Sequence, residues 1–201
     1  IDQANVEIYE AVFYLYYEQK LLDRALEISD RALLHHPNDP RIHFCRAMVL
    51  LALGRYIEGF KEYEWRNDYI NFNSLLGSVG KSMWSGIDPA GRRILVHSEQ
   101  GFGDIIQFAR YIPMLLAQGA KVIVEAPSEI QAVIESIPGV AKVIPFDLNG
   151  QLNFDFHCMM PSLARLFETT VETIPAQVPY LYADTQRIEK WRSTVHSHAC
   201  G

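Results

Sequence analysis

The residues best suited to chemistry lie in one segment, residues 93–113, with the sequence RILVHSEQGFGDIIQFARYIP. An apolar, strand-like run ends there in a turn that contains Gly101 and Gly103, and Asp104 follows just ahead of an amphipathic helical pattern. Glycine lets the backbone approach a ligand closely because it has no Cβ. Open α/β sheets bind their ligands at the carboxyl ends of the strands. Asp104 is therefore a candidate helix N-cap, a candidate site carboxylate, or both.

Three interpretations of this turn compete. The first is a dinucleotide-binding fingerprint, in which Gly101 and Gly103 are the first two glycines and Glu125 holds a ribose. Ile106 would then stand where the third glycine belongs, and Asp104 would repel a pyrophosphate at the same helix N-terminus. The second interpretation is structural, with Asp104 as the helix cap, which contributes about 1 kcal/mol. The third makes Asp104 a general base that faces the crevice, with the glycines leaving room for a substrate.

Other polar side chains near the turn are candidate substrate contacts. His97 and His157 end predicted strands at the same edge of the sheet, where either could orient an acceptor or form structural hydrogen bonds. Arg110 could pair with a substrate anion or with Glu99. The full set of candidate substrate-binding residues is Gln100, Gly101, Gly103, Gln107, Arg110, His97 and His157. The histidines near the end of the chain are too isolated for a metal site, so no metal is predicted.

The elements that must position these residues follow an alternating pattern. Strands are expected at residues 94–97, 122–125, 143–144, 154–157 and 178–181, and helices at 105–118, 128–137, 162–167 and 185–195. Apolar strands that alternate with helices predict a parallel, doubly wound sheet. Residues 93–195 are therefore expected to form a Rossmann-like domain, followed by a tail at 196–201.

The first third of the chain repeats itself. Residues 1–66 read as two helix–turn–helix units with a period of about 34 residues, which matches the tetratricopeptide repeat. Lys20 corresponds to Gly54 at the turn, and small residues such as Ala25 and Gly59 allow close helix packing. Residues 67–92, interrupted by glycine and proline, read as a linker in which Trp84 packs on a neighbouring element.

Composition limits the partners. The chain has 201 residues and a formal net charge of −6, with lysine and arginine scattered, so nucleic acid is not an expected partner. No apolar run approaches the roughly 20 residues of a membrane-spanning helix. Three widely separated cysteines favour a reducing compartment, hence a cytoplasmic location. Because the chain begins at Ile1, we expect it to be a piece of a longer protein.

Several short segments together resemble a known family. Gly103 and Asp104 after the first predicted strand, with Pro113 nine residues later, are similar to the first βα turn of the lipopolysaccharide heptosyltransferases, glycosyltransferase family 9. More precisely, the chain resembles bacterial proteins that join tetratricopeptide repeats to such a module, over about residues 6–195. The other matching pieces are YEWR at 63–66, WSG at 84–86, DFHC at 155–158, SL at 162–163, TIP at 173–175 and VPYL at 178–181.

This resemblance implies the amino-terminal, acceptor-binding half of a GT-B fold. The full enzyme would be an inverting transferase that moves a sugar from a nucleotide-sugar donor to a hydroxyl of a glycan, lipid-linked or protein acceptor, without a metal or other cofactor. Asp104 would be its catalytic base, and the repeats would bind a protein or peptide. The donor-binding half is not expected within these residues, so the chain alone would be inactive. The alternative is a non-catalytic tetratricopeptide-repeat scaffold.

Overall fold

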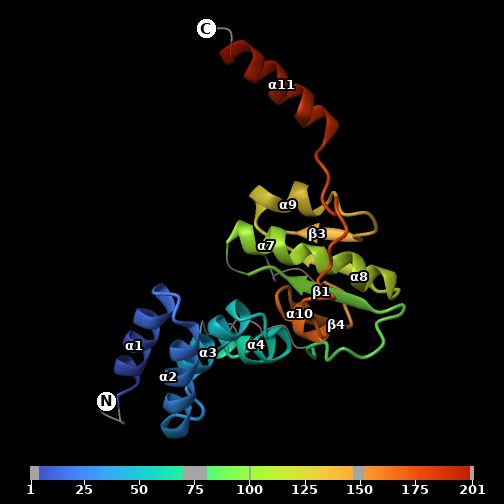
Figure 1. The fold of residues 1–201 in the computed structure, drawn as a ribbon. Coiled ribbons are helices and arrows are strands. Elements are labelled where there is room, and N and C mark those ends of the chain that lie inside the picture. The colour runs from blue at the N-terminus through green and yellow to red at the C-terminus, as the bar shows by residue number, and fades with distance from the viewer. Residues whose placement is uncertain (1–4, 70–80, 100, 147–151, 200–201) are drawn as a thin grey trace. The chain divides into compact units, whose positions relative to one another are not determined.

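The computed structural model describes residues 5–69, 81–99, 101–146 and 152–199. The chain divides into two compact units (Figure 1). One comprises residues 1–80 together with 164–174, and the other residues 81–163 together with 175–201. Each unit is described by itself.

The first unit is helical. Its helices are α1 (Val6–Glu18), α2 (Leu22–His35), α3 (Pro40–Ala52), α4 (Tyr56–Tyr63) and the short α5 (Arg66–Tyr69). Neighbours along the chain from α1 to α4 pack against one another, and α1 also contacts α3. The buried core between them includes Tyr9, Phe13, Ile28, Ile42 and Val49.

These helices repeat with a constant spacing of 34 residues. The first residues of α1 and α3 are that far apart, as are those of α2 and α4. Asn5 and Asp39 both cap a helix, each accepting a hydrogen bond from main-chain N–H groups of the first turn. Lys20 and Gly54 both have positive φ angles in the following turns. The repeat is therefore present in backbone conformation and capping as well as in sequence.

One segment expected in the second domain belongs to the helical unit. Residues 164–174 cluster with α1–α5 rather than with the sheet. Arg165 Nε lies 3.4 Å from Glu64 Oε2. A cavity of about 240 Å³ is lined from α4 by Tyr56, Ile57, Phe60 and Lys61 and from this segment by Ala164, Arg165, Glu168 and Thr169. The segment changes unit because its side chains pack over α4.

The second unit contains a parallel sheet of four strands (Figure 1). Its strands are β1 (Arg93–His97), β2 (Lys121–Glu125), β3 (Lys142–Ile144) and β4 (Phe156–Met159), in the order β3-β2-β1-β4. Every pairing is parallel, and β1 is bonded on both sides. Fully buried Ile94, Leu95 and Val96 explain the continuous apolar run, since a central parallel strand is covered on both faces.

The helix expected at residues 105–118 is three shorter pieces. They are α7 (Phe102–Phe108), the 3₁₀ turn η1 (Ala109–Tyr111) and α8 (Ile112–Ala117). Pro113 has no N–H to continue the ladder, which accounts for the interruption. The other helices after the sheet begins are α9 (Ser128–Ile134), α10 (Ser162–Leu166) and α11 (Thr185–Ala199), the last of which continues into the expected tail.

The strand expected at residues 178–181 is not present. Pro175 and Pro179 lack N–H donors, and the segment lies instead on the helices. Tyr180 donates its hydroxyl to the Ile106 carbonyl at 3.0 Å, and the N–H of Tyr182 donates to Ser136 Oγ at 2.9 Å. Among the described residues, none of the helices is long and apolar enough to cross a membrane.

Candidate functional site

The carboxyl ends of β1, β2 and β4 meet at one edge of the sheet. His97 is in register with Glu125 on one side and with Met159 on the other. The turn from β1 to α7 leaves from this edge, and it carries Asp104 in the first turn of α7. The sheet order thus places the chemical groups of three strands and of this turn at a common edge, as expected for a ligand-binding crevice.

Asp104 is not the N-cap of α7. That position belongs to Gly101, which makes no side-chain capping bond, and Asp104 lies three residues later within the helix. The Asp104 carboxylate is partly exposed and makes no hydrogen bond or ion pair with another described residue. Asp104 lies in the first turn of α7, near the positive end of the helix dipole. The capping interpretation is therefore wrong, and the carboxylate is open to a ligand.

The two glycines of the turn are not required by the fold. Gly101 has φ −81° and ψ 167°, which any residue can adopt. A Cβ added at Gly103 would meet nothing within 4 Å, and one at Gly101 only Asp104 Oδ2 at 4.0 Å. Neither backbone conformation nor packing explains glycine here. The missing Cβ atoms leave open space beside Asp104.

A line of hydrogen bonds runs below the surface from the carboxyl ends of β2 and β1 to His157 of β4. His157 was expected to end its strand, but it is the second residue of β4 and is in register with Leu95. Glu125 Oε2 lies 2.5 Å from His97 Nδ1, and His97 Nε2 lies 3.2 Å from His157 Nδ1. His157 Nε2 lies 3.2 Å from the main-chain oxygen of Lys81. All four ring nitrogens are thus engaged by the protein itself, which favours the structural role for both histidines over direct contact with an acceptor.

The burial of this line is nearly complete. His97, Glu125 and His157 are 3%, 4% and 2% exposed. Loss of hydration, reinforced by the charge of His97, lowers the pKa of His157 below its ordinary value. His157 is accordingly neutral near pH 7, while the carboxylate of Glu125 lies directly beside His97.

Arg110 is occupied by the segment after residue 174. Its Nε donates to the Gln107 carbonyl at 2.8 Å, its Nη1 lies 3.5 Å from the Pro175 carbonyl, and its guanidinium lies over the Tyr180 ring at 5.4 Å. Arg110 thus makes these contacts in place of the expected pairing with Glu99, whereas its contact with a substrate anion stays a prediction. Gln107 is exposed on α7, and Gln100 lies outside the described residues.

The sequence did not single out Ser98 or the main chain of Lys81. Ser98 directly follows β1, is 2% exposed, and its hydroxyl has no hydrogen-bond partner among the described residues. Buried hydroxyls are normally bonded, so this oxygen is available at the edge that carries Asp104. Its position just after an apolar strand was the signal that could have identified it. Within the described part of the chain, no group of three or more metal-binding side chains is present.

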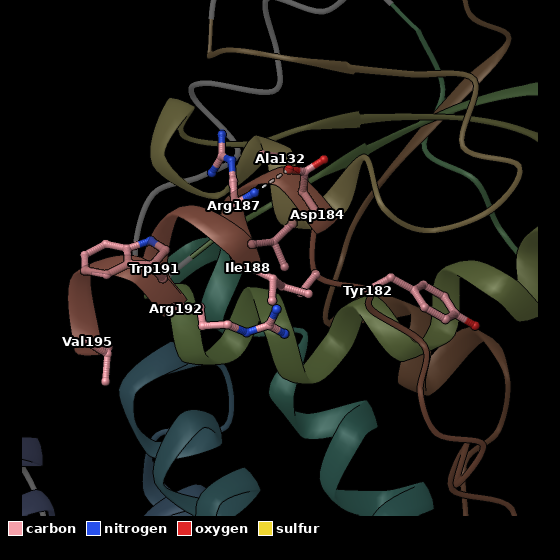
Figure 2. A pocket seen from close by; sticks show the side chains of 10 residues that line it. Ala132, Tyr182, Asp184, Arg187, Ile188, Trp191, Arg192 and Val195 are labelled. Carbon is pink, nitrogen blue, oxygen red and sulfur yellow. Dashed lines mark hydrogen bonds between the residues drawn. The ribbon is translucent and has the colours of Figure 1, made fainter. Parts of the chain in front are cut away.

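A separate cavity of about 570 Å³ lies between α9 and α11 and has no catalytic group of the predicted set in its wall (Figure 2). Ala132 and Val133 line it from α9, and Ile188 and Trp191 from α11. Asp184 Oδ1 accepts a hydrogen bond from the N–H of Arg187 at 2.8 Å, which caps the start of α11 (Figure 2). Because the polar groups converge at the strand ends instead, the candidate site is the edge with Asp104.

Comparison with known proteins gives one distant relative. The chain is similar to Protein FlbA of Caulobacter vibrioides, with 25% identity over 184 residues. The alignment covers 81% of this chain and 31% of that protein, so the chain spans less than a third of its relative. No protein-family model matches the chain, and no solved structure matches it.

Proposed function

We propose that the second unit is the acceptor-binding half of an inverting glycosyltransferase, with Asp104 as the general base. The observation that carries the proposal is the open Asp104 carboxylate, held at the carboxyl edge of a parallel sheet beside two glycines that the fold does not require. The proposal also rests on the resemblance of residues 99–113 to the heptosyltransferase turn.

In the proposed reaction, Asp104 removes the proton from an acceptor hydroxyl as its oxygen attacks the anomeric carbon of the sugar. The bond from that carbon to the nucleotide diphosphate breaks, and the diphosphate leaves with the electron pair. The donor would be held by another part of the parent protein. A positioned carboxylate of this kind contributes typically about 10²–10⁴-fold to the rate.

We further propose that the helical unit is a pair of tetratricopeptide repeats that binds a protein or peptide. The 34-residue spacing of helix starts, caps and turns supports this assignment. A cytoplasmic location fits the cysteine content and belongs to the same proposal.

The decisive experiment compares two aspartates in the full-length protein. Asp104→Asn removes the base, and Asp23→Asn is the matched control, because Asp23 also lies in the first turn of a helix and is exposed. Each variant should lose about 0.3–1 kcal/mol of stability through the helix dipole. Only Asp104→Asn should lose sugar transfer, by at least about a hundredfold.

Two outcomes would contradict the proposal. Near-normal turnover of a well-folded Asp104→Asn protein would remove the catalytic role of this carboxylate. A full-length wild-type protein that transfers no sugar from any nucleotide-sugar would favour the non-catalytic scaffold.

A further inference from the structure

The hydrogen bonds of the buried line determine how many protons it holds. The Lys81 carbonyl can only accept, so His157 Nε2 must carry a proton. The contact between the two imidazoles needs a second proton, and the contact between His97 and Glu125 needs a third. Two neutral imidazoles and one carboxylate supply only two protons. One additional proton is therefore required for all three bonds to exist together.

We infer that Glu125, His97 and His157 act as a one-proton latch, which holds the segment at residues 81–84 against β4 while the shared proton is present. The proton can reside on Glu125, on His97 or on His157, and in each case every contact keeps one donor and one acceptor.

A change of one proton in either direction breaks the latch. With a further proton on the line, two N–H groups would face each other across the 3.2 Å between His97 and His157. With one proton fewer, two lone pairs would face each other at one of the contacts. Either arrangement leaves buried polar groups without hydrogen-bond partners, which destabilises it. The latch is thus closed in an intermediate pH range and opens on both sides of it.

The latch controls the outer edge of β4. Met83 forms a parallel bridge with His157, and the N–H of Trp84 donates to the His157 carbonyl at 2.7 Å. The N–H of His157 donates to the Ser82 carbonyl at 3.3 Å. His157 thus bonds the segment at residues 81–84 through its main chain and through its ring. When the ring loses its partner His97 on β1, His157 is less firmly held, and the segment bonded to it is released.

The groups around His157 are few. From β1 it faces His97, and through His97 it is linked to Glu125 of β2. The Phe154 ring lies with its centroid 6.4 Å away, and the segment before β1 contributes the Lys81 carbonyl, while the Lys81 side chain is exposed. Just before its own strand, Asp155 Oδ2 lies 3.6 Å from Arg93 Nε.

The test uses the complete 201-residue chain with ¹⁵N-labelled histidine. Near neutral pH, we expect Glu125, His97 and His157 to hold three protons between them. In Glu125→Gln the carboxamide N–H can donate to His97 Nδ1, so two ring protons are enough for all three contacts. In the wild-type protein, the protection of the Trp84 amide from hydrogen exchange should fall at least about tenfold once the pH is high enough to remove the shared proton, the effect expected for the loss of one hydrogen bond. In Glu125→Gln this fall with rising pH should be absent.

His43 provides the control, since its imidazole also lies between a carboxylate, Glu62 at 2.5 Å, and a main-chain carbonyl, Pro37 at 2.9 Å, but has no second imidazole. Glu62→Gln should leave the pH dependence of Trp84 exchange as it is in the wild-type protein. Two neutral rings beside an ionised Glu125 in the wild-type protein would overturn the inference, a result that does not depend on any variant folding. A loss of Trp84 protection with rising pH that is the same in the wild-type protein and in a folded Glu125→Gln protein would also overturn it.

Discussion

Lys20 and Gly54 occupy equivalent left-handed positions, one in each turn of the repeated helical unit. Their φ angles are 60° and 75°, and they lie 34 residues apart. Glycine adopts this conformation at no steric cost, whereas a side chain at such a position costs roughly 1–2 kcal/mol. The backbone of the first turn is therefore more strained than that of the second, because it holds a lysine where the second turn has glycine.

We expect Lys20→Gly to stabilise the helical unit by about 0.5–1 kcal/mol, because it removes the Cβ from a left-handed position. The lysine ammonium lies 5.5 Å from the centre of the Tyr17 ring, a contact that the substitution also removes. Urea unfolding followed by circular dichroism measures the difference. Gly54→Ala is the reciprocal variant and should destabilise the unit; a stabilised Gly54→Ala protein would contradict this account.

Gly59→Ala should destabilise the contact between α3 and α4. The added Cβ would lie 2.8 Å from Leu51 Cδ2 and 3.1 Å from the Leu51 main-chain nitrogen, so Leu51 must move. Overpacking of this kind costs typically about 1–3 kcal/mol. The equivalent position in the first repeat already carries a methyl group, Ala25, which is fully buried. Leu51→Ala in the Gly59→Ala background should recover part of the loss, which a double-mutant cycle of thermal unfolding would detect.

Two tryptophans of the second unit should differ sharply in their contribution to stability. Trp84 is 3% exposed and donates Nε1–H to the Ile87 carbonyl at 2.8 Å, whereas Trp191 is 64% exposed on α11. Trp84→Ala should cost about 3–5 kcal/mol. Trp191→Ala should change stability by no more than about 0.5 kcal/mol. Equal losses in guanidinium unfolding of the two variants would show that α11 is packed rather than exposed.

The pH dependence of unfolding should carry the signature of His157. Burial lowers the pKa of this residue in the folded chain below 6.5, so the unfolded chain binds a proton first as the pH falls. The contribution of His157 to the free energy of unfolding is present above that pH. It is lost as the pH falls through the pKa that His157 has in the folded chain. Relative to His157→Phe, the wild-type protein should therefore lose stability on acidification from pH 7 to pH 5. A wild-type protein that gains stability relative to the variant over this range would contradict the assignment.

Nucleotide-sugars should not bind tightly to the 201-residue chain by itself. In the proposed function the donor would bind another part of the parent protein. Asp104 also places a negative charge where a pyrophosphate would otherwise bind the start of α7. Calorimetry with nucleotide diphosphate sugars should show no micromolar affinity. Micromolar binding that increases in Asp104→Asn would instead support a phosphate site at the glycine turn.

The parallel sheet could be predicted from the sequence because each buried strand is a short apolar run between polar turns. The residues of β1 and β2 were anticipated within one position. For β4 the expected range was two residues early. Asp155 uses its main-chain N–H and its carboxylate to bond the main chain of Arg93, and the strand begins only after it.

Contacts between side chains were harder to predict from the sequence than the strands were. Both histidines were expected at strand ends, but His157 is the second residue of β4. The contact of Glu125 with His97 depends on the register of β2 with β1. Arg110 contacts the Pro175 carbonyl, which lies 65 residues later in the chain. Hydrogen bonds across such distances depend on tertiary packing, which local patterns do not encode.

The central place of β1 in the sheet has a consequence for synthesis of the chain on the ribosome. One edge of β1 pairs with β2 early, but its other partner begins only at Phe156. Until then an apolar strand has an open edge, which can pair with another nascent chain. Folding of the helical unit is also incomplete until residues 164–174 have been synthesised, because they belong to it. Products terminated before residue 156 should therefore aggregate. Neither unit can complete its fold until both β4 and residues 164–174 have been translated.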